Sequence, residues 1–293
     1  MTPHDPPPRR SVRPRDLARE LRPEQSPALL QELHLLTRRG QLNADALRKL
    51  KQVNHLIRLL EPALDDVYAR HPEPRLLDVG SGNSYLGFLL HEVVIGPAGR
   101  GEIVSLEARE EMTRRSRERA LKLGHTRMRF ATGAIASWRP PERLHLVTAL
   151  HACDTATDDA LVLALRHGVD HVAVVPCCQA EVAAQLAALP RSSGLNSPMS
   201  LLHAHAWHRR EFGSHLTNVI RALTLESFGY QVTVTELVGW EHSFKNELIL
   251  GRRVHAESRR ARQELESLLE ATGVAPKLTR ALGIGGGTTP PPD

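Results

Sequence analysis

The 293-residue sequence contains few aromatic residues, few cysteines and no long hydrophobic run. Aromatic side chains make up 4% of the residues, so leucine, valine, isoleucine and alanine must build most of the core. Three cysteines, two of them adjacent, do not suit a disulfide framework and instead suit a reducing compartment. No apolar stretch approaches the roughly 20 residues that a membrane-spanning helix needs. The start of the chain is rich in Pro and Arg, unlike a secretory signal. We therefore expect a cytoplasmic protein with no membrane partner.

The remaining composition is that of a globular protein with a basic charge. Hydrophobic residues make up 41% of the chain and charged residues 24%, with a formal net charge of +5. A basic balance weakly favours nucleic acid or other acidic partners, but an Arg-rich protein without such a partner would show the same balance.

Composition and apolar spacing divide the chain into five successive segments. They are a disordered basic arm (1–25), a helical cap (26–73), a main domain (74–252), a C-terminal helix (253–272) and a disordered tail (273–293). Within the cap, we expect Pro62 to kink or restart the second helix, because proline cannot donate a backbone hydrogen bond.

In the main domain, short apolar runs alternate with longer helical patterns. The predicted strands are 75–79, 102–106, 128–132, 144–150, 171–175, 231–238 and 245–250. The predicted helices are 84–95, 110–123, 155–166, 180–188 and 214–228. This alternation predicts an α/β fold with a doubly wound, mostly parallel sheet, closed by an antiparallel pair of strands.

A glycine-rich loop joins the first predicted strand to the first predicted helix. Glycines there allow a tight turn and let a ligand approach the backbone closely. In a doubly wound sheet, ligands bind at the carboxyl ends of the strands. We therefore predict a cofactor-binding loop, with an ordinary strand-to-helix turn as the alternative. The predicted binding residues are Asp78, Gly80, Ser81, Gly82 and Asn83.

The loop departs from the dinucleotide fingerprint G-x-G-x-x-G. Tyr85 occupies the position of the third glycine, and the next glycine is Gly87. A bulky residue there suits a pyrophosphate poorly, and the charge of Asp78 would repel a phosphate. A cationic ligand such as S-adenosylmethionine tolerates that charge better, so a nicotinamide-dependent oxidoreductase is the less favoured enzyme class.

Two further turns of the predicted sheet contribute to this site. Glu107 ends the second strand, where a carboxylate can accept hydrogen bonds from both ribose hydroxyls; a helix-start acid is the alternative. Ala134 and Ile135 follow the third strand and could pack against an adenine ring, although an ordinary loop is nearly as compatible.

Together these residues resemble the class I S-adenosylmethionine-dependent methyltransferases. Three motifs carry a narrower likeness: Asp78 to Gly87, His151 to Asp158, and Pro176-Cys177-Cys178. They resemble the methyltransferase domain of the glutathione S-transferase C-terminal-domain-containing proteins and, more distantly, the tRNA 2′-O-methyltransferases of the acceptor stem. The resemblance implies a Rossmann-like, seven-stranded sheet and S-adenosylmethionine as methyl donor. RNA is the first expectation for the acceptor.

The sequence also departs from that class. Ala134 stands where many members have an acid, which weakens any contact to the adenine amino group. The Asp/Asn-Pro-Pro-Tyr motif of many amino-group methylating enzymes is absent after the fourth strand, where His151 to Asp154 stand instead. Base N-methylation by that mechanism is therefore less favoured, and a non-catalytic module that binds S-adenosylmethionine or RNA stays open.

Histidine and cysteine residues follow the fourth and fifth strands. His151 or Asp154 could accept the proton of the acceptor, and Asp154 could also cap the helix that starts at Thr155. A metal site is the weaker alternative, since the H-x-C and C-C spacings are unusual for zinc; we predict no metal, and buried structural thiols instead. The candidate ligands weighed here are His151, Cys153, Cys177 and Cys178.

A histidine-rich segment follows the predicted helix 180–188. His203 to His215 include Trp207, Arg209 and Arg210, a combination that could contact RNA or cover the acceptor side. A loop with surface histidines is the alternative interpretation.

Overall fold

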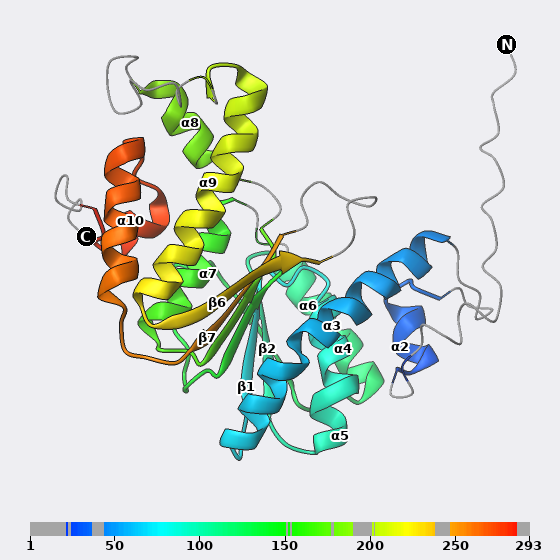
Figure 1. Ribbon diagram of the computed structural model, residues 1–293. Coiled ribbons are helices and arrows are strands. Elements are labelled where there is room, and N and C mark those ends of the chain that lie inside the picture. Colours follow the sequence, from blue (N-terminus) through cyan, green and yellow to red (C-terminus); the bar gives the residue numbers. More distant parts are fainter. Residues whose placement is uncertain are drawn as a thin grey trace, which may run out of the picture.

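A computed structural model describes residues 22, 25–36, 44–150, 152, 154–176, 179–189, 201, 203–237 and 247–285. Within them the chain forms one seven-stranded sheet with helices on both faces (Figure 1). The spatial order of the strands is β3 (Met128–Thr132), β2 (Glu102–Glu107), β1 (Arg75–Val79), β4 (Leu146–Ala149), β5 (His171–Val174), β7 (Glu247–Arg253) and β6 (Tyr230–Glu236). The first five are parallel, and β7 is antiparallel to both of its neighbours. The predicted fold class is confirmed.

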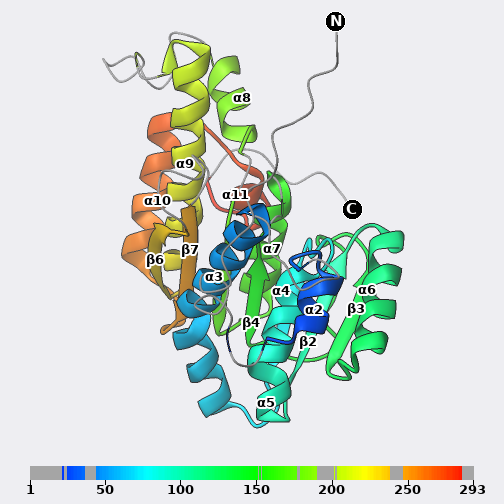
Figure 2. The same ribbon diagram turned by 90° about the vertical axis from the view of Figure 1, so that its right-hand side faces the viewer.

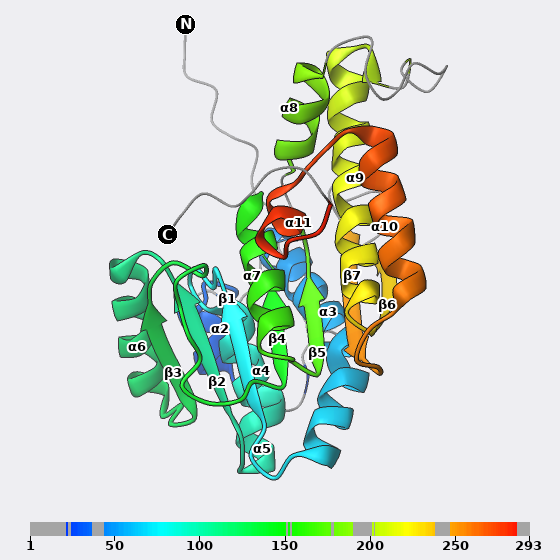
Figure 3. The same cartoon turned by 90° about the vertical axis from the view of Figure 1, so that its left-hand side faces the viewer.

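The helices pack in two layers. Figure 2 faces the layer that contains α2 (Pro27–Glu32), α3 (Ala44–Arg70), α4 (Tyr85–Leu90) and α6 (Glu110–Leu123). In that layer α4 continues through a π-helical turn, η1 (His91–Ile95), into α5 (Gly96–Ala98). Figure 3 faces the other layer, which contains α7 (Thr155–Arg166), α8 (Glu181–Ala188), α9 (Ala206–Ser227), α10 (Arg259–Thr272) and α11 (Lys277–Ala281).

Side chains of the central strands point alternately to the two faces of the sheet and pack into a core on each face. In β1, Leu76 packs into the cluster formed with α3 and α4, whereas Leu77 packs into the cluster formed with α7. Successive side chains of a strand point to opposite faces, so a strand covered on both sides must be apolar throughout. Among the four buried residues of β1, Asp78 is the one with a charged side chain, which marks it for function.

The predicted restart at Pro62 is wrong, because α3 runs continuously from Ala44 to Arg70. Pro62 and Arg58 both lie on the exposed side of α3. Water can therefore hydrate the Arg58 carbonyl, which loses its N–H partner to the proline, and the helix continues on its buried side.

Several boundaries also differ from the predictions. Helix α9 begins at Ala206, eight residues before the expected start, and α10 begins at Arg259 rather than at 253. The tail predicted over 273–293 contains α11, and Ile284 beyond it is buried. The two last strands end at Glu236 and Arg253 instead of at 238 and 250.

Two described residues of the predicted disordered arm contact α3. The Arg22 guanidinium pairs with Glu61 at 2.7 Å, and the buried Gln25 amide donates to the Asn54 side chain at 2.7 Å. The rest of segment 1–25 lies outside the described residues.

None of the helices formed by the described residues combines the length and the apolar character needed to cross a membrane.

Candidate functional site

The order of the strands reverses between β1 and β4. From β1 the chain proceeds outward to β2 and β3, and it then returns to pair β4 with the other side of β1. The loops that follow β1 and β4 therefore lead to opposite faces, and the carboxyl edge between them, here called the crevice, is the place where ligands of such sheets bind. All of the predicted cofactor residues lie at this edge or in the turns that follow it.

The glycine loop is held in left-handed backbone conformations. Gly80 has φ +61° and Gly82 has φ +54°, values that glycine adopts without the strain of a side chain. A Cβ added to Gly82 would meet no atom within 4 Å, so the loop faces open space there. The Ser81 N–H donates to the Leu106 carbonyl at 3.2 Å, which ties the loop to the end of β2.

Asp78 is a buried acid directly before this loop. Its side chain is 3% exposed, and its Oδ1 accepts a hydrogen bond from the Thr148 hydroxyl at 2.9 Å. Burial raises the pKa of Asp78 to about 7, and the Thr148 hydrogen bond opposes this only in part. A cation bound beside Asp78 would favour the ionised carboxylate.

Glu107 is a second buried acid, at the end of the adjacent strand. Its Oε2 accepts from the Gly82 N–H at 2.8 Å, and its Oε1 accepts from both the N–H and the Nε of Arg109, at 3.1 and 2.7 Å. Burial alone would raise the pKa of Glu107, but these hydrogen bonds outweigh it and lower the pKa. A carboxylate offers about four acceptor positions, so Oε2 retains room for a ribose hydroxyl.

Tyr85 and Gly87 explain the departure from the dinucleotide fingerprint. The Tyr85 ring packs in the core below the cap, and its hydroxyl donates to the Leu33 carbonyl at 2.6 Å, so it does not fill the loop. A Cβ at Gly87 would come within 2.9 Å of the Ser105 hydroxyl. Gly87 thus provides the close helix-to-strand packing that the third glycine provides in the fingerprint.

The turn after β3 closes the side of the crevice. The Gly133 N–H donates to the Glu107 carbonyl at 3.1 Å, which places the turn next to the end of β2. Ile135 is half-buried against the core with Trp138, whereas Ala134 is exposed. The turn therefore offers an apolar side chain and a small residue beside Glu107.

Of the residues predicted after β4 and β5, only Asp154 is described. His151, Cys153, Cys177 and Cys178 lie outside the described residues. Asp154 occupies the N-cap position of α7, but its side chain does not cap the helix. Instead, its Oδ1 accepts from the Ala180 N–H at 3.1 Å and joins the loop after β4 to the loop after β5. Its backbone has φ +50° and ψ −120°, a strained conformation for a non-glycine residue.

A buried arginine supports this strained residue. Arg221 of α9 is 1% exposed and donates through Nη2 to the Asp154 carbonyl at 3.0 Å. Its Nε donates to Asp158 at 2.8 Å, and its Nη1 to the Asn218 side chain at 3.2 Å. Burial raises the pKa of Asp158, and the charge of Arg221 opposes that effect.

Asn218 extends the connections to two further segments. Its Nδ2 donates to Glu247 at the start of β7 at 2.8 Å, and its Oδ1 accepts from Gln179 at 3.2 Å. The loops after β4 and β5, helix α9 and the start of β7 are thus joined by one polar network, which sequence reasoning missed. The available signal was a charged residue, Arg221, within an otherwise apolar helical stretch.

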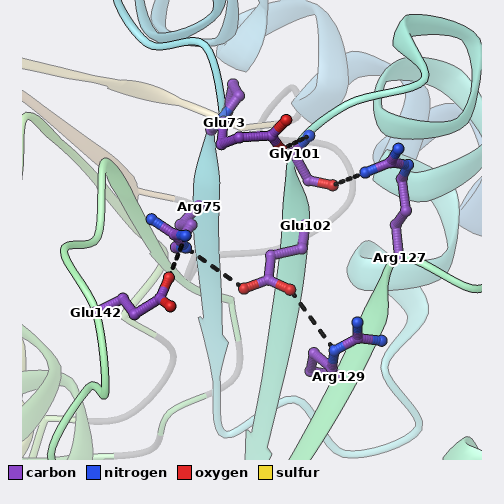
Figure 4. Close-up of a pocket in the computed structure, with 8 residues that line it drawn as sticks. Glu73, Arg75, Gly101, Glu102, Arg127, Arg129 and Glu142 are labelled. Carbon is purple, nitrogen blue, oxygen red and sulfur yellow. Dashed lines mark hydrogen bonds and ion pairs between the residues drawn. The ribbon is translucent and has the colours of Figure 1, made fainter.

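A pocket at the opposite, amino edge of the sheet is separate from this crevice (Figure 4). Glu102 forms ion pairs with Arg75 at 3.5 Å and with Arg129 at 3.6 Å, and Arg75 also pairs with Glu142. Three glutamates and three arginines line the pocket, so its charges balance and favour neither an anion nor a cation.

A histidine cluster near the same edge has the residue types of a metal site. The ligand atoms of His71, His145 and Asp170 lie within 4.8 Å of one another. However, the two rings stack at 3.8 Å, and Asp170 pairs with Arg143 at 3.1 Å and Arg70 at 3.6 Å. Stacked rings do not direct their nitrogens to one point, and two guanidinium groups oppose a further cation. We assign no metal here.

Comparison with known proteins agrees with this description. Residues 48–185, just under half of the chain, match a family model described as a methyltransferase domain. The search of the curated proteins found no match. The strand order and the family match together support a class I methyltransferase domain, with S-adenosylmethionine as the methyl donor of that class.

Several solved structures share the general fold at low identity. An rRNA methylase from Streptococcus thermophilus is 12% identical with a TM-score of 0.45, over 68% of this chain and 96% of that chain. A SAM-dependent methyltransferase from Aquifex aeolicus is 16% identical with a TM-score of 0.38, over 69% and 97%. An SAH-bound methyltransferase from Podospora anserina is 16% identical with a TM-score of 0.43, over 79% and 89%. Since these TM-scores lie below 0.5, the inferences below rest on the chain's own residues.

Proposed function

We propose that this protein is an S-adenosylmethionine-dependent methyltransferase that acts on RNA. The observation that carries the donor assignment is the pair of buried carboxylates, Asp78 and Glu107, on either side of a left-handed glycine loop. They lie at the ends of two adjacent strands, at the point where the strand order reverses. The Arg109 guanidinium is already paired with Glu107 at 2.7 Å, and two acids at the loop favour a cationic nucleoside over a dinucleotide.

We assign the donor contacts to the residues that border the crevice. Asp78 would face the positive charges of the donor, and Glu107 would accept from the ribose hydroxyls. Ala134 and Ile135 would border the adenine. The backbone of the glycine loop would lie against the amino-acid part of the donor, through Gly80, Ser81, Gly82 and Asn83.

When bound, the donor supplies an activated methyl group, and this chain must orient the nucleophile and remove its proton. We assign proton removal to His151, since a neutral imidazole accepts a proton near neutral pH. Asp154 already accepts from the Ala180 N–H, which favours a positioning role for its carboxylate over that of a base. Much of the rate would come from holding the nucleophile in line with the methyl group.

The acceptor assignment to RNA rests on the basic charge of +5 and on the distant resemblance to tRNA 2′-O-methyltransferases. We also propose that the chain is related to the methyltransferase domain of the glutathione S-transferase C-terminal-domain-containing proteins. A non-catalytic module that binds the donor is the second candidate, and the departure at Ala134 favours it. A nicotinamide-dependent enzyme is less favoured, because the charge of ionised Asp78 would repel a pyrophosphate.

Calorimetry with S-adenosylmethionine and S-adenosylhomocysteine tests the donor site, with NAD as the control ligand. We expect wild type to bind the first two and Gly80→Arg to lose both, because the new side chain would be strained at φ +61° and would enter the crevice. Gly99→Arg is the matched control: it has φ +65° but lies at the end of α5. No binding by wild type, or equal loss in the two variants, would sink the assignment.

A transfer assay with a labelled methyl group tests turnover on pooled RNA and, separately, on pooled protein. We expect label in the RNA, and a loss of about 100- to 10,000-fold in His151→Ala, the range typical of general bases. Donor binding without transfer to either pool would instead support the binding module.

A further inference from the structure

The first turn of α9 carries the most exposed aromatic side chain among the described residues. Trp207 is 65% exposed, and the guanidinium of Arg210 lies 4.5 Å from its ring centroid. Leu201, a few residues earlier, is 69% exposed. Beyond this contact with Arg210, most of the indole surface is open to water, so this surface is suited to a partner.

This surface lies beyond the carboxyl edge of the sheet, on the acceptor side. The Ser214 hydroxyl donates to Gln179 at 2.8 Å, which marks where α9 passes the loop that follows β5. Trp207 precedes Ser214 by seven residues, so it stands about 10 Å further out along the helix. Figures 1 and 3 show the start of α9, with α8 beside it, rising above the strand ends.

The surroundings of Trp207 are cationic and can bind hydrogen-bond acceptors. Arg210 is 56% exposed, and its one anionic neighbour, Glu211, lies 3.4 Å from its Nε at the surface. Arg209 is half-buried, and its Nη1 donates to the His203 carbonyl at 3.4 Å. No acid precedes Glu211 in the first turn of the helix, where backbone N–H groups also favour anions.

We propose that the surface formed by Leu201, Trp207, Arg209 and Arg210 binds single-stranded RNA. An unpaired base would stack on the exposed face of Trp207, and the guanidinium of Arg210 would contact the adjoining phosphate. Stacking on an aromatic side chain needs an unstacked base, which a duplex does not offer. The inference rests on the proposed RNA acceptor. It adds that a second nucleotide of that RNA, outside the reaction site, binds to α9.

Fluorescence anisotropy with a labelled oligouridylate 12-mer tests the proposal at 50 and 200 mM salt. We expect Trp207→Ala to weaken binding about 5- to 150-fold, the range of one base-stacking contact, and Trp207→Phe to retain most of the affinity. Arg210→Gln should weaken binding and flatten the salt dependence by about 0.7 in the log–log slope. A duplex of the same length should bind more weakly than the single strand.

Two surface variants are matched controls. Leu121→Ala removes another exposed apolar side chain, and Arg260→Gln removes another exposed arginine with a glutamate partner. Equal losses in these controls, an unchanged Trp207→Ala, or equally tight duplex binding would overturn the proposal. One further result would overturn it. If the wild type binds no RNA but self-associates in sedimentation, and Trp207→Ala abolishes that self-association, the surface binds a second copy of the chain. Calorimetric titration of the same variants with S-adenosylmethionine separates failure of this proposal from failure of the proposed donor site. If the donor site is wrong, no donor binds, but RNA binding at α9 can still be observed.

Discussion

At the scale of single residues, the crevice depends on two acids with opposite titration behaviour. Asp78 has almost no polar support, and its pKa is raised to about 7, whereas hydrogen bonds from Arg109 and Gly82 lower the pKa of Glu107 against the effect of burial. At neutral pH, Glu107 is therefore ionised and Asp78 is partly protonated. Of these two acids, Asp78 is the one whose charge changes near physiological pH.

We expect donor affinity to rise with pH because a cationic donor selects ionised Asp78. Below pH 7 the carboxyl must lose its proton on binding, so affinity should fall up to tenfold per pH unit and level off above pH 7. Calorimetry between pH 5.5 and 8, in buffers of different ionisation enthalpy, measures both the affinity and the released proton. Asp78→Asn should bind more weakly and with no pH dependence in this range. A flat wild-type profile would contradict the placement of the cation beside Asp78.

At the scale of secondary-structure elements, the central network holds the loops of the acceptor side in place. Asp154, in its strained conformation, and Gln179 both receive support from α9 through Arg221 and Asn218. All three cysteines of the chain lie within two positions of Asp154 or Gln179 in the sequence. Thiol reactivity is therefore a local probe of these loops.

We expect Arg221→Met to destabilise the protein by about 3–5 kcal/mol, because it leaves Asp158 buried without its partner. The double variant Arg221→Met, Asp158→Leu should recover most of that stability, since both charges are gone, but it cannot restore the hydrogen bond to the Asp154 carbonyl. Its thiols should therefore react faster than those of wild type. Urea unfolding and thiol labelling measure the two effects, and wild-type labelling rates in the double variant would show that Arg221 does not hold the loop.

The spacing of apolar residues predicted the helices and strands that pack one side against the core. The bounds of β1, α6, β3 and α7 agree with those expected from apolar spacing. The start of α9 was missed because its first two turns project beyond the sheet, where no buried stripe reveals the helical period. The Arg221 network could not be predicted, because Asp158 and Arg221 are 63 residues apart and a lone arginine in a helix usually reads as solvent-facing.

At the scale of the whole molecule, buried histidines make the free energy of unfolding depend on pH. Burial, and then the neighbouring His125, lowers the pKa of His91 to about 4; burial, and then His71, lowers the pKa of His145 to about 4. These histidines are neutral when folded but take up protons near pH 6.5 when unfolded, so their contribution is complete above pH 6.5 and is lost as pH falls to 4. Asp78, Asp158 and Glu226, whose pKa values burial raises, act in the opposite sense, and His171, whose pKa burial lowers, acts with the two histidines.

We therefore expect the buried histidines to lower the midpoint of thermal unfolding between pH 7 and pH 5. His91→Phe should reduce that fall, because the His91 Nδ1 has no hydrogen-bond partner and its ring stacks on His125 at 4.2 Å, contacts that an apolar ring can replace. His255→Phe, at an exposed position, is the control and should leave the fall unchanged. If the wild type and His91→Phe show the same dependence of the unfolding midpoint on pH, then His91 does not contribute to the acid sensitivity.

The hydrogen bond from Tyr85 to the Leu33 carbonyl determines how the protein can be divided for laboratory work. Leu33 precedes the family match at 48–185, and β7, which pairs with the free side of β5, follows it. A fragment cut to the matched segment would lose the anchor of the first residue of α4 and would expose β5 as an open edge, inviting strand-to-strand aggregation. A fragment for expression and crystallisation therefore needs Leu33 and β7 in addition to the matched segment.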